Sequence, residues 1–206
     1  LGSQAISTSL KAGAIGLAIV MVFMIIMYAV PGIAASLALA IYTTLVIATL
    51  YLFEITLTLP GIAGIILGIG MAVDANVIVF ARVREEIATG KSVQTSMKIG
   101  FQKAMSAILD GNITTLIASV VLMALGSGTV KGFAYTLMIG IILSLFTAMV
   151  VTRYILYSLY ALGLKSEKLY GRAKERKSID FIGKKAVFFT ISGIIIAAGL
   201  ISMGVH

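Results

Sequence analysis

The acidic residue Asp74 is set apart from the other acids because it lies inside a long apolar stretch. The stretch covers residues 57–80, and Arg82, the first basic residue beyond it, follows Asp74 by eight positions. At 1.5 Å per helical residue, Asp74 would lie about 12 Å inside the end of a membrane-spanning helix. An ionised carboxylate at such a depth costs at least about 2.5–3.5 kcal/mol on insertion scales. We interpret Asp74 as a proton carrier that alternates between neutral and charged forms. The alternative is a hydrogen-bonded residue that only fixes the register of its helix.

Four other polar residues are candidates for supporting such a carrier. Asn76 lies in the same stretch, and Asn112 and Thr114 lie within the next one. Asn112 and Thr114 can hydrogen-bond to a neighbouring helix, typically for about 0.6 kcal/mol, or hold Asp74 or a water on a proton path. Both readings stay open. Asp110 opens the same stretch at the membrane interface, where we expect it to cap a helix.

Small residues form a stripe on the stretch that carries Asp74. Gly61, Gly64, Gly68, Ala72 and Ala75 recur at the spacing of one helix face. Small side chains let another helix backbone approach closely within a membrane. The three glycines are therefore predicted to serve helix packing and no chemistry.

The rest of the sequence excludes several kinds of site. It has no cysteine, and its one histidine is His206, so disulfides and Cys-ligated metals are excluded. No nucleophile–base pair, phosphate loop or metal-ligand cluster is recognisable, and a lone Asp74 lacks the partner that an intramembrane protease needs. We expect no enzyme activity, no cofactor and no metal. The net charge of +8 sits in loops and at helix ends, which argues against nucleic acid binding.

The amino-acid composition predicts the kind of helices that position these residues. The chain of 206 residues is 60% hydrophobic and 12% charged, whereas soluble domains are about 45–50% apolar and about 25% charged. About 20 apolar residues cross a bilayer core of about 30 Å. We therefore predict an all-α integral membrane protein with about six transmembrane helices in a lipid bilayer. The stretches are 12–28, 33–53, 57–80, 107–125, 133–156 and 186–204, with a tight turn over 29–32 between the first two.

Basic residues predict how these helices are oriented. Apart from Lys11, Lys131 and Arg153, all lie in two loops, 81–106 and 158–185. Loops rich in Lys and Arg face the cytoplasm, so both loops are predicted there. In the first loop Ser92 is a predicted N-cap. An apolar stripe follows it and indicates either a helix on the membrane surface or a solvated connector. The stripe consists of Val93, Met97, Phe101, Ala104 and Ile108.

The two ends of the sequence suggest how this chain relates to a longer protein. The chain starts at Leu1 with no initiator Met and no signal peptide pattern, and it stops at the end of an apolar stretch. We expect it to be a piece of a larger protein.

Five segments carry specific motifs. They are Leu57-Thr-Leu-Pro-Gly-Ile-Ala-Gly64, Gly70-Met-Ala-Val-Asp-Ala-Asn76, Arg82-Val-Arg-Glu-Glu86, Asp110-Gly-Asn-Ile-Thr-Thr115 and Lys131-Gly-Phe-Ala-Tyr-Thr-Leu137. Together they resemble SecD, a membrane subunit of protein export, over residues 1–160. Ala81 departs from the family, which often places Glu there. Ser178-Ile-Asp-Phe-Ile-Gly-Lys-Lys185 resembles the opening of SecF. The chain is thus similar to a fused SecDF, with five SecD-like helices in 1–160, a basic linker at 161–185 and the first SecF-like helix at 186–206.

This resemblance implies half of an RND-type transmembrane bundle in the bacterial cytoplasmic membrane. It implies a proton-driven auxiliary of the SecYEG translocon that helps move unfolded preproteins outward. It further implies that Asp74 carries the proton. The acidic and arginine partners of Asp74 would lie in the remaining SecF half, and the external domains would also lie beyond this chain. Two alternatives stay open: an RND-type exporter of lipids or small molecules, and a non-transporting translocon scaffold.

Overall fold

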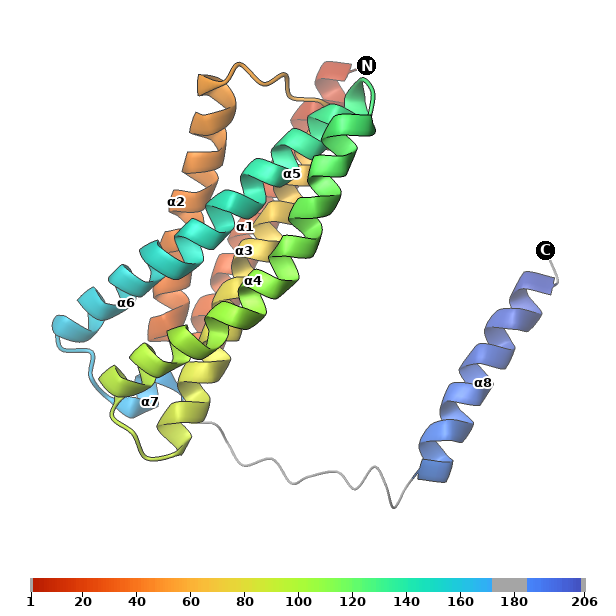
Figure 1. The fold of residues 1–206 in the computed structure, drawn as a ribbon. Coiled ribbons are helices and arrows are strands. Elements are labelled where there is room, and N and C mark those ends of the chain that lie inside the picture. The colour runs from red at the N-terminus through yellow and green to blue at the C-terminus, as the bar shows by residue number, and fades with distance from the viewer. Residues whose placement is uncertain (1, 172–184, 205–206) are drawn as a thin grey trace. The chain divides into compact units, whose positions relative to one another are not determined.

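The computed structural model describes residues 2–171 and 185–204, which fall into two units. Within these residues the regular structure is all helical, as predicted (Figure 1). The first unit contains α1 to α7, and the second contains α8. The helices are α1 (Gly2–Tyr28), α2 (Val30–Leu52), α3 (Leu59–Ala88), α4 (Val93–Leu125), α5 (Thr129–Phe146), the π-helical turn η1 (Thr147–Val151), α6 (Thr152–Ala161), α7 (Glu167–Tyr170) and α8 (Lys185–Gly204).

Five helices of the described residues are long and apolar enough to cross a membrane. They are α1, α2, α3, α4 and the continuous helix from α5 through α6. The sixth predicted stretch coincides with α8, in which the residues with described side chains, Phe188–Gly199, form an apolar helix. Two segments lie outside the described part of the chain, residues 172–184 and residues 205–206. The first includes most of the predicted linker and the SecF-like motif apart from Lys185.

Local chemistry explains where these helices begin. Pro31 and Pro60 occupy the first turns of α2 and α3, where proline needs no hydrogen-bond donor and its φ suits a helix. Thr58 caps α3, since its Oγ1 accepts a hydrogen bond from the Gly61 backbone N–H at 3.1 Å. The predicted turn over 29–32 is shorter than expected. Only Ala29, with φ of 49°, separates α1 from α2.

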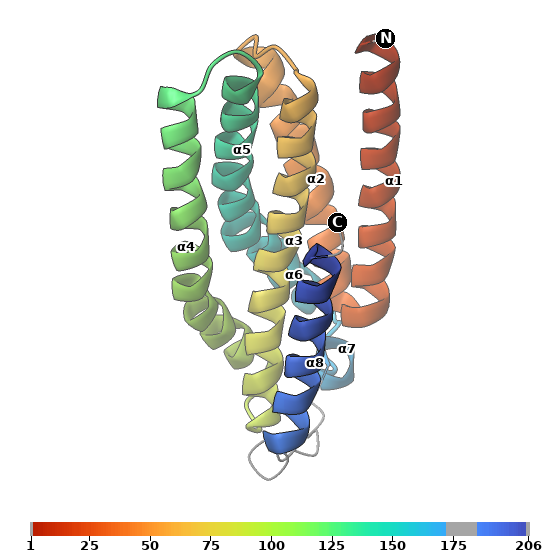
Figure 2. The same cartoon turned by 90° about the vertical axis from the view of Figure 1, so that its right-hand side faces the viewer.

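The predicted loop over 81–106 is mostly helical. The helix α3 continues to Ala88, and α4 starts at Val93 after a turn of four residues. Ser92 caps α4 as predicted, because its Oγ accepts a hydrogen bond from the Thr95 N–H at 3.3 Å. The prediction of a surface helix or solvated connector is wrong. Each member of the apolar stripe is at most 3% exposed and belongs to the core of the bundle. This part of α4 bends toward α3 (Figure 2).

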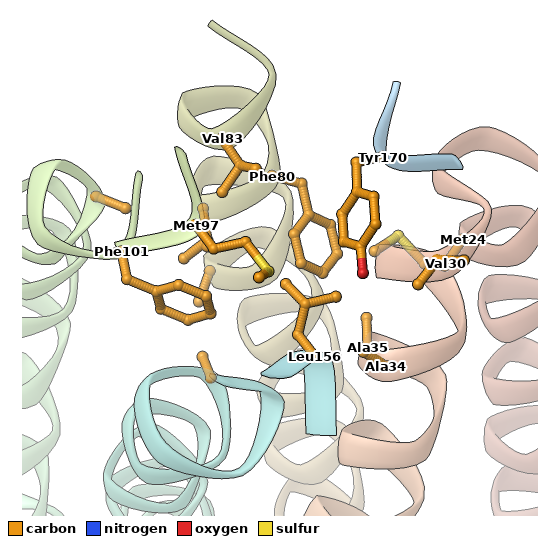
Figure 3. Packing of buried hydrophobic residues seen from close by; sticks show 14 of the residues in the cluster. Met24, Val30, Ala34, Ala35, Phe80, Val83, Met97, Phe101, Leu156 and Tyr170 are labelled. Atoms are coloured by element: carbon orange, nitrogen blue, oxygen red, sulfur yellow. The ribbon is translucent and has the colours of Figure 1, made fainter. Parts of the chain in front are cut away.

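The buried core consists of two clusters around α3. One lies where the ends of α1 and α6 meet α3 and α4, and it includes Phe80, Met97, Leu156 and Tyr170 (Figure 3). The other surrounds Tyr42, on α2. Among its neighbours, α3 has its most extensive contacts with α5 and α4. It is therefore the central helix that positions Asp74.

The small-residue face of α3 packs against neighbouring helices. A Cβ added at Gly61 would lie 3.5 Å from Thr136 Cγ2 on α5. A Cβ at Gly64 would collide with the Thr136 hydroxyl, and one at Gly68 with the Tyr42 hydroxyl. Larger residues at Gly64 and Gly68 would therefore push α5 and α2 away from α3.

Candidate functional site

Asp74 lies on the outer side of α3, next to α4. Its side chain is exposed on the surface of the first unit, whereas Ala75 and Asn76 beside it are buried. This difference follows from the helix geometry, since successive residues point about 100° apart. Within the first unit, the face of α3 that carries Asp74 is thus exposed.

A small cavity of about 150 Å³ lies between α3 and α4 at Asp74. At a share of about 30 Å³ per liquid water molecule, this volume corresponds to about five waters. The polar residues in its lining are Asp74, Asn112 and Thr115, and the others are small or apolar. Met71, Ala75 and Ile78 come from α3, and Ala107, Ile108 and Gly111 come from α4. The cavity is open to the surface of the first unit, and the Asp74 carboxyl lies in its lining beside two other polar side chains.

Asn112 and Thr115 present polar atoms to this cavity. The Asn112 side-chain N–H donates to the Ile108 carbonyl at 2.7 Å, and the Thr115 hydroxyl donates to the Gly111 carbonyl at 3.5 Å. Each bond uses one donor, so the Asn112 carbonyl oxygen and the lone pairs of Thr115 remain available to water. The cavity thus has two acceptors close to the acid.

Thr114, which the sequence suggested, is not part of the cavity lining. It is exposed, and its hydroxyl donates to the Asp110 carbonyl at 3.5 Å. Thr115 takes its place because residues three and four apart share a helix face, which puts Thr115 beside Asn112. Helical spacing from Asn112 would have identified it.

Asn76 points into the bundle and away from the Asp74 cavity. It is 2% exposed, and its Nδ2 donates to the Ala72 carbonyl at 2.9 Å. Its Oδ1 has no hydrogen-bond partner in the part of the chain that the structure describes. Asn76 and Asp74 therefore belong to different environments despite their proximity in sequence.

Asp110 does not cap a helix, so that prediction is wrong. Because α4 already begins after Ser92, Asp110 lies in its interior. Its Oδ2 accepts a hydrogen bond from the Ser106 hydroxyl at 3.4 Å, and the residue is exposed. It is absent from the lining of the Asp74 cavity.

No ion pair of Asp74 is found within residues 2–171 and 185–204. The acids paired there are Glu85, with Arg82 at 2.7 Å, and Glu86. Neither Lys131 nor Arg153 pairs with Asp74. Within the first unit, the structure therefore pairs no basic side chain with this carboxyl.

Glu86 forms a cluster that sequence reasoning missed. It lies in the charged last turns of α3, beyond the apolar stretch, and its side chain is 5% exposed. It accepts hydrogen bonds from Lys103, at 2.6 Å, and from Lys91. These bonds, with Lys103 contributing most, lower the pKa of Glu86. The cluster joins the end of α3 to the turn and the first part of α4.

Arg84, two residues earlier, joins α3 to α1 and α7. Its Nη2 donates to the Met27 carbonyl at 2.7 Å, and its Nε donates to the Tyr170 carbonyl at 3.4 Å. The guanidinium also lies 4.4 Å from the centre of the Tyr28 ring. These partners are 57 and 86 positions away along the chain, so no local motif could have indicated them.

Comparison with known proteins places this bundle in a family. Residues 1–161 match the family described as "Protein export membrane protein SecD/SecF, C-terminal". The "Protein translocase subunit SecD" of Acidaminococcus fermentans is 52% identical over 159 residues, which cover 77% of this chain and 38% of that protein. The protein of the same name from Synechocystis is 54% identical over 156 residues, covering 76% and 33%.

A solved structure is similar as well. It is described as SecDF, a translocon-associated membrane protein from Thermus, and it matches with a TM-score of 0.83 and 33% identity. The match covers 96% of this chain and 27% of that one. The chain thus spans little more than a third of the length of these relatives, or less.

Proposed function

The chain belongs to the SecD/SecF family of protein-export membrane proteins, and we propose that it is part of a proton-driven auxiliary of protein translocation. In this proposal it works beside the SecYEG translocon in the bacterial cytoplasmic membrane and helps move unfolded preproteins outward. The names of its relatives support a role in translocation. The proton gradient is the energy source, and no cofactor or catalytic reaction is involved.

The observation that carries the proton role is the environment of Asp74. Its carboxyl borders a small cavity with two further polar groups, and no cation of the described residues neutralises it. Water in the cavity can deliver a proton to the carboxyl or accept one from it. Acids within membrane helices commonly mark such proton relays. The exposed side of α3 leaves room for the remaining SecF half to approach.

The arrangement of the first unit supports a cytoplasmic location for the basic loops. The turn between α3 and α4 lies at the same end of the bundle as α7, and the connections from α2 to α3 and from α4 to α5 lie at the other end (Figure 1). Lys91, Lys165 and Lys168 belong to the first end. By the positive-inside rule this end faces the cytoplasm.

The decisive experiment compares acid-to-amide variants of the full-length protein during preprotein transport in sealed vesicles. Asp74→Asn keeps the shape of a protonated Asp but cannot release a proton. We expect it to retain assembly with the translocon and to lose the stimulation by an imposed proton gradient. Asp74→Glu should keep part of the stimulation, with a shifted pH optimum.

Asp110→Asn is the matched control. It removes a carboxyl from the neighbouring helix outside the cavity, so gradient stimulation should stay near the wild-type level. Full stimulation in Asp74→Asn would contradict the carrier role and favour the scaffold alternative. Gradient-driven export of a lipid or small molecule without any effect on preproteins would favour the exporter alternative.

A further inference from the structure

The long helix formed by α5, η1 and α6 carries one cation near each end of its apolar part. Lys131 and Arg153 are 22 positions apart, which corresponds to about 33 Å of helix. This length is close to the hydrocarbon thickness of about 30 Å. Figure 1 shows α5 and α6 as one continuous, tilted helix. Because the tilt shortens this length along the membrane normal, Arg153 lies close to one membrane face when Lys131 lies at the other.

A π-helical turn directly precedes Arg153 and sets its direction. The turn covers Thr147–Val151, and the Thr152 hydroxyl donates to the Thr147 carbonyl, five residues back, at 3.1 Å. A π-turn adds one residue to a helical turn, so every later side chain is rotated by about 100° relative to an uninterrupted α-helix. Such turns occur frequently at functional sites. The rotation here directs Arg153 toward α4.

Two aromatic rings lie near the Arg153 guanidinium. Its centre lies 5.8 Å from the ring centre of Tyr157 and 6.0 Å from that of Phe101 on α4. Among the residues that the structure describes, Arg153 has neither an ion pair nor a hydrogen bond with a carboxylate. These distances are at the outer limit of a cation–π contact, and Arg153 is exposed. Its N–H donors therefore remain available to an anion.

An open cavity of about 390 Å³ lies over the face of η1 and α6 that carries Arg153, and all of its lining residues come from this one helix. Met149 and Val150 line its apolar part, and Tyr154 and Tyr157 add two phenol groups beside Arg153. Tyr154 is 71% exposed, which is expected of an aromatic residue at the membrane interface. The lining thus combines a cation and two hydroxyl donors with an apolar surface that continues toward the hydrocarbon.

We propose that this cavity binds an anionic phospholipid, with Arg153 holding the phosphate. Guanidinium and phosphate form paired, charge-assisted hydrogen bonds, and the two tyrosines can donate to further lipid oxygens. The acyl chains lie along Met149 and Val150, which a free phosphate ion could not use. This site is separate from Asp74, and its existence does not depend on the proton-carrier role.

Lipid titration of the purified full-length protein, followed by native mass spectrometry, tests the site. The probes are phosphatidylglycerol and phosphatidylcholine with identical acyl chains. We expect Arg153→Gln to weaken phosphatidylglycerol binding by at least about tenfold and to weaken phosphatidylcholine binding less, because the choline cation already balances the charge of its phosphate. Arg153→Lys should fall between the wild type and Arg153→Gln, because an ammonium lacks the planar fork of donors. Its retained binding would also show that the fold tolerates substitution here.

Lys98→Gln is the charge-matched control, since Lys98 is exposed on α4 and does not line the cavity. A general surface attraction contributes about fivefold per cation, so this variant should lose no more than that. Equal losses in Lys98→Gln and Arg153→Gln would overturn the site. So would equal affinity of the wild type for the two lipids, or displacement of the bound lipid by excess inorganic phosphate.

Discussion

Two acids on α3, twelve positions apart, have opposite surroundings. Glu86 is buried and accepts hydrogen bonds from two lysines of α4 and the preceding turn. Asp74 borders a cavity, and no cation of the described residues pairs with it. The charge of Glu86 is therefore stabilised by its own chain, whereas the charge of Asp74 is left to water and to groups beyond the described residues. The same helix thus carries one acid in a structural ion-pair cluster and, in our proposal, another for proton exchange.

The largest expected difference between the two acids is in thermal stability. Replacing Glu86 by an amide should lower it, and replacing Asp74 by an amide should not. Glu86→Gln should lower the midpoint of thermal unfolding of the full-length protein in nanodiscs, because the two lysines lose their buried counter-charge. Asp74→Asn should leave the midpoint unchanged or raise it, because no ion pair is lost and an amide is cheaper than a carboxylate within a membrane.

Glu85→Gln calibrates this measurement. Glu85 pairs with Arg82 three residues earlier, and both side chains are about half exposed. Exposed pairs of this kind contribute at most about 1 kcal/mol, so we expect a shift of no more than about 2–4 °C. A decrease in Asp74→Asn as large as that in Glu86→Gln would mean that Asp74 is also a structural acid.

The sequence predicted the apolar helices, the Ser92 cap and the small-residue face of α3, since each depends on local spacing. Two predictions about α4, for its apolar stripe and for Asp110, were wrong for a physical reason. The stripe through Met97 and Phe101 would suit a membrane surface as well as a protein core, and only the contacts of α3 and α6 decide between them. Asp110 was misplaced for the same reason, because a cap can be assigned only where a helix begins.

Other features depend on residues far apart in the sequence and could not be predicted from it. The contacts of Arg84 with Met27 and Tyr170, and that of Glu86 with Lys103, join different helices. The π-turn before Arg153 has no recognised motif in the sequence. Thr115 is different, because helical spacing from Asn112 would have indicated it.

A smaller and pH-dependent effect should separate the wild type from Glu86→Gln. Because the folded-state pKa of Glu86 is lowered, the stability that its charge contributes is fully present above its unfolded pKa of about 4.3. It is lost as the pH falls through the lower folded pKa. The midpoint difference between the two proteins should therefore stay constant from pH 7 to about pH 5 and shrink in more acidic buffer. A difference that grows on acidification would show that Glu86 is not held as a carboxylate.

The smallest effect that still distinguishes the two acids concerns the polar groups that line the cavity beside Asp74. Thr115→Val removes one polar group from the cavity lining while the side chain keeps its size. A water that loses one partner is held less firmly, and a lost hydrogen bond of this kind is worth about 0.5–1.5 kcal/mol. We expect gradient-stimulated transport to fall about two- to tenfold, with little change in the unfolding midpoint. Thr114→Val is the matched control, since this exposed hydroxyl bonds only to the Asp110 carbonyl of its own helix. If both variants slow transport equally, the effect belongs to α4 as a whole, and the cavity has no special part in proton exchange.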